Sequence, residues 1–156
     1  QGPWQAKLAY YHLSSHLGDE YWAKNPDFVR NNYSRDCLVL GVGYFVNPAL
    51  RLYCETAFGM YVSGPADPWE FQFGAEYSPP YVPGRAIAPF WALNGQLRQE
   101  LNFGGNFVAQ VGYQIRGRPY GPLFRLGLQY YNGGSPQMQF YNRSEQQLGF
   151  GLWYDY

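Results

Sequence analysis

A short segment near the start of the chain holds side chains that could activate a serine as a nucleophile. Residues 10–20 read Tyr-Tyr-His-Leu-Ser-Ser-His-Leu-Gly-Asp-Glu. His12 precedes Ser14 by two residues, and along an extended strand this spacing puts both side chains on one face. A histidine beside a serine can act as the general base that makes the hydroxyl nucleophilic. The spacing therefore predicts Ser14 as the nucleophile and His12 as the general base.

A third group must orient the histidine in such an arrangement. Asp36 lies within Asn-Tyr-Ser-Arg-Asp at residues 32–36, and it has the parity of the apolar face of its own predicted strand. It also falls near the end of that strand that adjoins His12. We therefore predict Asp36 as the orienting carboxylate, with Asp19 and Glu20 in the intervening loop as alternatives.

The same polar residues have a second interpretation. His12, Ser14 and His16 share one parity, and together they could form a hydrogen-bonded polar rim at one end of the strand. Asp19 and Glu20 carry the hard oxygen ligands that calcium prefers, although two adjacent carboxylates more often face water. Calcium at these two residues is the one cofactor that the sequence suggests.

The segments that must position these residues show strict period-2 alternation. In residues 50–62 every even position from Leu50 to Val62 belongs to one mainly apolar face, and Arg51 to Tyr61 make the other. Eight such strands are predicted, at about residues 4–17, 35–46, 50–62, 69–78, 87–100, 107–116, 124–130 and 145–156. Most are long enough to cross a bilayer when tilted, which takes about 9–11 residues.

Turn residues separate these segments at regular intervals. Asn47–Ala49, Pro79–Arg85 and Gly117–Gly121 are predicted as turns at one end of the sheet. The longer connections Gly18–Ser34 and Asn132–Ser144 fall at the opposite end. Outer-membrane barrels keep short turns in the periplasm and longer loops outside. An even number of strands then places both termini in the periplasm.

Charged residues avoid the apolar faces of residues 50–62, 69–78, 107–116 and 124–130. The opposite faces of the last six strands collect Arg51, Arg98, Arg116, Arg125, Glu55, Glu70, Glu76, Glu100 and Asp155. Such a nearly balanced set can pair internally in a narrow lumen. Eight strands leave room only for side chains, so we expect no open pore. The rival fold is a soluble barrel or sandwich with the apolar face inside.

Composition agrees with a membrane wall. The 156 residues predict one domain, residues 1–156, with 14% charged and 21% aromatic residues at a mean hydropathy of −0.42. No apolar run reaches the length of a transmembrane helix, and the zero net charge gives no basis for a nucleic-acid partner. We predict an all-β fold, an eight-stranded antiparallel transmembrane β-barrel of up-and-down topology. Cys37 and Cys54 have opposite parity and are expected to stay unpaired.

The end of the chain, Gly151-Leu152-Trp153-Tyr154-Asp155-Tyr156, resembles the terminal recognition strand of outer-membrane proteins. The resemblance implies insertion into a bacterial outer membrane by the barrel-assembly machinery. Trp4, Tyr44, Tyr113, Tyr154 and Tyr156 would then form an aromatic girdle at the periplasmic end.

His12-Leu13-Ser14 resembles the His-x-Ser core of lipid A deacylases and outer-membrane phospholipase A. That resemblance implies hydrolysis of an acyl ester in an outer-leaflet phospholipid or lipopolysaccharide. Residues 12–20 and 32–36 also resemble an uncharacterised family of bacterial outer-membrane barrels. The alternative is a barrel without enzymatic activity, an anchor or assembly subunit that binds a protein partner through outer loops such as Tyr130–Arg143.

Overall fold

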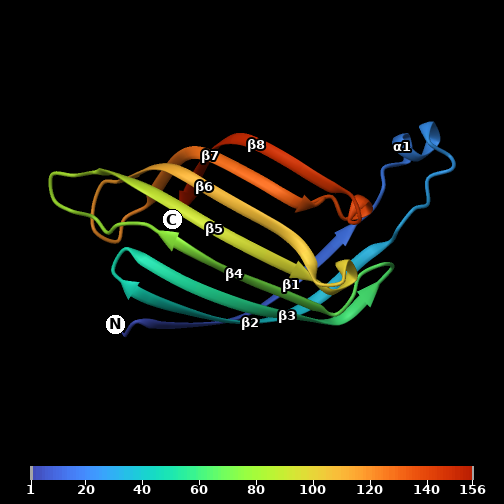
Figure 1. The fold of residues 1–156 in the computed structure, drawn as a ribbon, viewed down its shortest axis with the longest axis horizontal. Coiled ribbons are helices and arrows are strands. Elements are labelled where there is room, and N and C mark those ends of the chain that lie inside the picture. Colours follow the sequence, from blue (N-terminus) through green and yellow to red (C-terminus); the bar gives the residue numbers. More distant parts are fainter. Residues whose placement is uncertain (1, 156) are drawn as a thin grey trace.

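The structure, a computed structural model, describes residues 2–155 (Figure 1). Its strands are β1 (Trp4–Ser15), β2 (Tyr33–Asn47), β3 (Leu50–Ser63), β4 (Trp69–Tyr77), β5 (Ile87–Arg98), β6 (Gly104–Arg116), β7 (Leu123–Gly134) and β8 (Ser144–Asp155). Its helices are α1 (Asp19–Lys24) and the 3-10 turns η1 (Gln99–Leu101) and η2 (Met138–Phe140). No helix among residues 2–155 combines the length and apolar character needed to cross a membrane.

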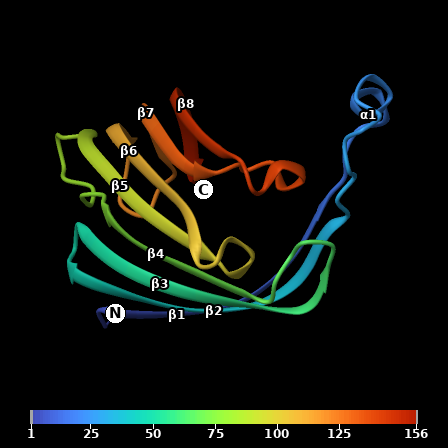
Figure 2. The same cartoon turned by 45° about the vertical axis from the view of Figure 1, so that its right-hand side comes forward.

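The prediction of eight antiparallel strands in up-and-down order is confirmed. Each strand pairs with the next along the chain, in the order β1 to β8, and every pairing is antiparallel. The sheet is strongly curved, with one concave and one convex face (Figures 1 and 2). Within the described residues β1 and β8 do not pair, so each leaves one edge of the sheet free.

The connections divide between two ends of the sheet. We call the end that holds α1, η1 and η2 the helical rim, and the end that holds Gly2 and Asp155 the terminal rim (Figure 1). The predicted turns at residues 47–49, 79–85 and 117–121 lie at the terminal rim, and the two longest predicted connections lie at the helical rim. Tyr156 lies outside the described residues.

The convex face is apolar and exposed along the whole sheet. One large apolar side chain from every strand illustrates this, with exposed fractions between 40% and 72%: Leu8, Leu40, Leu52, Phe73, Leu93, Val111, Leu128 and Phe150. The concave face, by contrast, holds the most deeply buried charges. Arg35 and Arg98 are 0% and 1% exposed. This polarity is the reverse of a water-soluble sandwich, in which charged side chains are almost never fully buried.

The charges on the concave face pair with one another, as the balanced set predicts. The ion pairs are Lys7–Glu55 at 2.8 Å, Arg35–Glu70 at 2.9 Å, Arg51–Glu76 at 3.3 Å, Arg125–Asp155 at 3.3 Å and Arg98–Glu100 at 3.8 Å. Arg116 donates instead to the carbonyl of Gly121 at 3.4 Å. Each predicted inward charge therefore has a partner from the protein itself.

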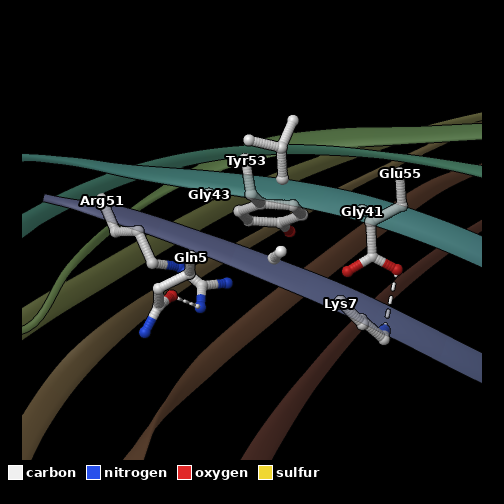
Figure 3. Close-up of a pocket in the computed structure, with 9 residues that line it drawn as sticks. Gln5, Lys7, Gly41, Gly43, Arg51, Tyr53 and Glu55 are labelled. Carbon is white, nitrogen blue, oxygen red and sulfur yellow. Dashed lines mark hydrogen bonds and ion pairs between the residues drawn. The ribbon is translucent and has the colours of Figure 1, made fainter. Parts of the chain in front are cut away.

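Two glycines on β2 let side chains from β1 and β3 meet over the strand between them. Figure 3 shows Lys7 and Glu55 joined beside Gly41, and Arg51 donates to Gln5 at 3.3 Å beside Gly43. A Cβ atom at position 41 would lie 3.0 Å from Cγ of Glu55 and 3.3 Å from Cβ of Lys7. Because Gly41 has no side chain, the ion pair between Lys7 and Glu55 can cross over β2.

The sequence-based assignment of side chains to the two faces of the sheet is wrong at one end of β3. The β2–β3 register steps from Cys37↔Gly59 to Asp36↔Tyr61, which leaves Met60 as the extra residue of a bulge. A bulge shifts the side-chain parity beyond it. Tyr61 therefore joins the convex face and is exposed, whereas Val62 turns to the concave face opposite Arg35.

The two thiols are free, as predicted from their parity. Cys37 is buried on the concave face, where Arg35 Nε donates to its sulfur at 3.0 Å. Cys54 is exposed on the convex face, between Val42 of β2 and Phe73 of β4. The sheet itself separates the two sulfur atoms.

Candidate functional site

The β1–β2 register assembles a polar cluster on the convex face near the helical rim. His12 lies directly opposite Asp36, and Ser14 lies opposite Ser34. Directly opposed residues of antiparallel strands share a face and have neighbouring Cβ atoms. The strand pairing alone therefore brings the predicted histidine and carboxylate together, although residues 16–32 separate the two strands in the chain.

Asp36 is the centre of this cluster. Its Oδ1 accepts a hydrogen bond from the Tyr10 hydroxyl at 2.6 Å, and the same oxygen lies 2.7 Å from Nδ1 of His12. An ionised carboxylate only accepts, so His12 carries a proton on Nδ1. This leaves Nε2 of His12 for other chemistry. The histidine side chain is 55% exposed and the aspartate 28%.

Ser14 has a different partner from the one predicted. Its Oγ lies 2.8 Å from Nε2 of His16, the first residue after β1. Among residues 2–155 Ser14 makes no hydrogen bond with His12. The structure thus forms two adjacent pairs on one face of β1, the His12–Asp36 pair and the Ser14–His16 pair.

The two loop carboxylates lie apart from this cluster. Asp19 and Glu20 open α1, and Asp19 forms an ion pair with Arg30. The part of the chain that the structure describes holds no group of three or more His, Cys, Asp or Glu side chains arranged to hold a metal ion. Calcium at Asp19 and Glu20 stays a prediction that this geometry leaves untested.

Sequence reasoning missed three residues near the site. Tyr10 has the parity of His12 and could have been found from that signal. Arg35, the most deeply buried charge, alternates with Tyr33 and Cys37 on the concave face of β2. Gln139 of η2 has no local sequence signal, because its partners come from the other end of the chain.

Gln139 connects the β7–β8 hairpin to the β1–β2 hairpin at the helical rim. Its Nε2 donates to the carbonyl oxygens of Ser15, at 2.9 Å, and Asn31, and its Oε1 accepts from the backbone N–H of Asn31 at 3.2 Å. Phe140 packs against Phe28 with 5.4 Å between ring centroids. The end of β1, beside the candidate site, is thereby held against the β7–β8 connection.

These observations define an all-β protein, a curved up-and-down antiparallel sheet with an apolar convex face, buried ion pairs inside and a Ser–His–Asp cluster at one rim. The chain belongs to the family described as protein of unknown function DUF1207, which matches it over residues 1–156. No curated protein and no solved structure matches the chain.

Proposed function

We propose that this chain forms the wall of a β-barrel in a bacterial outer membrane, with the convex face against lipid. The observation that carries the proposal is the reversed polarity of the sheet. An apolar band runs over all eight strands outside, while Arg35, Arg98 and their carboxylate partners lie inside. Transmembrane β-barrels alternate in this way, with lipid-facing apolar and lumen-facing polar side chains.

Aromatic side chains at both ends of the convex face support the same placement. Trp4, Tyr44, Tyr113 and Tyr154 are exposed near the terminal rim, and the rings of Trp4 and Tyr44 lie 4.7 Å apart. A second group, toward the helical rim, runs from ring to ring at 4.8 to 6.1 Å through Phe58, Trp69, Phe71 and Phe103. Aromatic girdles at both interfaces are typical of outer-membrane barrels.

Matched substitutions on neighbouring residues test the membrane placement. Val111→Arg puts a charge on the convex face and Gln110→Arg puts one on the concave face of the same strand. Near the membrane midplane a lipid-facing Arg costs about 2–4 kcal/mol, so Val111→Arg should lower the folded fraction in lipid vesicles far more than Gln110→Arg. Equal effects, or a native chain that is monodisperse in buffer without detergent, would contradict the proposal.

A second function rests on the polar cluster. We infer that Ser14 hydrolyses an acyl ester of an outer-leaflet lipid, because hydroxyl, imidazole and carboxylate converge on the lipid-facing side of the wall near the helical rim. With both termini in the periplasm, the helical rim lies at the outer surface of the membrane. Three polar side chains at that position are costly against lipid unless they serve a purpose.

The neighbouring serine provides the control for this activity. Ser15 lies next to Ser14 but on the concave face. Purified protein in mixed micelles should release fatty acid from phospholipid or lipid A, and Ser14→Ala should abolish that release while Ser15→Ala retains it. Full activity in Ser14→Ala would show that Ser14 is not the nucleophile. No release from either lipid would leave the barrel as a non-enzymatic anchor or partner-binding platform.

A further inference from the structure

We propose that His16 is the general base for Ser14 and that His12, held by Asp36, is the acid that protonates the leaving alcohol. This inference rests on the proposed hydrolase function and assigns its proton transfers. Within residues 2–155 each of the two imidazoles has one hydrogen-bond partner, and the two partners differ. His16 contacts the nucleophile, whereas His12 contacts the carboxylate.

The contact between Ser14 and His16 carries the first assignment. A general base must lie within hydrogen-bond reach of the proton that it removes. The 2.8 Å separation between Ser14 Oγ and His16 Nε2 meets that requirement. The pair also needs no rearrangement of β1, since His16 directly follows the strand that carries Ser14.

The hydrogen bonds of Asp36 carry the second assignment. His12 donates its Nδ1–H to Asp36, and Tyr10 donates to the same oxygen, so the imidazole is fixed from one side. In its imidazolium form His12 offers one further donor, Nε2–H. His12 lies two residues from Ser14 on the same convex face, a spacing that suits a group delivering a proton to the oxygen that leaves.

The proton transfers balance over one turnover. Ser14 Oγ forms a bond to the acyl carbon as its proton passes to Nε2 of His16. The bond between the acyl carbon and the alcohol oxygen then breaks, and that oxygen takes the proton from Nε2 of His12. Water attacks the acyl-enzyme and returns a proton to His12. Ser14 Oγ leaves the acyl carbon, recovers its proton from His16, and releases the fatty acid.

Substrates with different leaving groups separate the two roles. A p-nitrophenyl ester releases a stabilised phenolate that needs no proton, whereas the alcohol of a phospholipid ester does. His16→Gln should lose about a hundredfold or more of the rate on both substrates. His12→Gln should lose that much on the phospholipid, whereas on the p-nitrophenyl ester it should keep the first-turnover burst of p-nitrophenol, because only the later attack of water needs His12. Asp36→Asn, which changes a positioning residue, should follow His12→Gln.

A fluorophosphonate probe gives a readout that does not depend on the leaving alcohol. Its fluoride departs without a proton, so labelling of Ser14 should disappear in His16→Gln and persist in His12→Gln. Retained heat-modifiable mobility in gels checks that each variant is folded. If His12→Gln loses labelling and both ester activities while His16→Gln keeps them, His12 is the base and the inference is wrong. If Ser14→Ala retains activity, Ser14 is not the nucleophile and the proposed function itself fails.

Discussion

Lys7 and Glu55 form an ion pair of 2.8 Å on the concave face, although β2 lies between the strands that carry them. The pair is possible because Gly41, the residue between them, has no side chain (Figure 3). A glycine in the middle of a strand therefore has a definite function here: it makes room for a contact between next-nearest strands.

Replacing Gly41 should destabilise the sheet. Gly41→Val would press its side chain against Glu55 and Lys7, and overpacking of this kind costs about 1–3 kcal/mol. Gly149 on β8 provides the control, because nothing lies within 4 Å of a Cβ atom built there. Urea unfolding of both variants in lipid vesicles, followed by tryptophan fluorescence, should show a lower midpoint only for Gly41→Val. Equal midpoints would contradict the crowding that the geometry indicates.

Removal of Arg35 should be more costly still. Arg35 is fully buried and donates to Glu70 at 2.9 Å, so Arg35→Met leaves a carboxylate without its counter-charge. Such a loss costs about 3–5 kcal/mol. The double variant Arg35→Met/Glu70→Gln should recover part of that loss, because no unpaired charge then remains. Denaturant titration of the two variants in vesicles measures the difference.

Arg51 supplies the comparison for a more exposed pair. It lies 3.3 Å from Glu76, and both side chains are about one-third exposed. Ion pairs in contact with water contribute about 0–1 kcal/mol, so Arg51→Met should shift the unfolding midpoint much less than Arg35→Met. Similar shifts would mean that burial does not set the strength of the pairs on the concave face.

Gln139 should control the order of the helical rim. Gln139→Ala removes the side chain that bonds Ser15 and both backbone groups of Asn31. Limited proteolysis should then cut the β1–β2 connection faster. Gln137→Ala is the matched control, since Gln137 is exposed and its side chain makes no hydrogen bond among residues 2–155. Unchanged cleavage in Gln139→Ala would show that the aromatic contacts of Phe140 alone hold this rim.

Cys54 offers a direct measure of what covers the convex face. A nitroxide attached there in a Cys37→Ser background should collide more often with oxygen than with a water-soluble nickel chelate, because lipid dissolves the first and excludes the second. Tyr120 is a fully exposed turn residue. A nitroxide on Tyr120→Cys, in a background that lacks both native cysteines, should show the opposite preference. Free access of the nickel chelate to position 54 would place water, and not lipid, against this face.

Alternation was sufficient to predict every strand, because a sheet with two different environments imposes a period of two on its sequence. It failed where the period is interrupted. The bulge at Met60 exchanges the faces of Tyr61 and Val62, and a single extra residue leaves no composition signal. Arg35 follows the alternation of its strand, yet only the register with β3 and β4 shows that it meets Glu70.

At the candidate site, too, the alternating pattern predicted only part of the arrangement. Parity and strand order were enough to bring His12 opposite Asp36. They could not decide which histidine contacts Ser14, because His12 and His16 stand at equal spacing on either side of it. That choice depends on side-chain rotamers and on the path of the chain beyond Ser15, and neither is encoded in a period-2 pattern.

The free edges of β1 and β8 restrict how the sheet can be completed. In the proposed membrane placement, unpaired backbone N–H and C=O groups along a strand cannot remain against hydrocarbon. Because the strand count within the described residues is even, β1 and β8 run in opposite directions. One intervening strand would have to be parallel to one of its neighbours. Direct pairing of the two edges, or insertion of strands in twos, is therefore the only way to close a cylinder of wholly antiparallel hydrogen bonding.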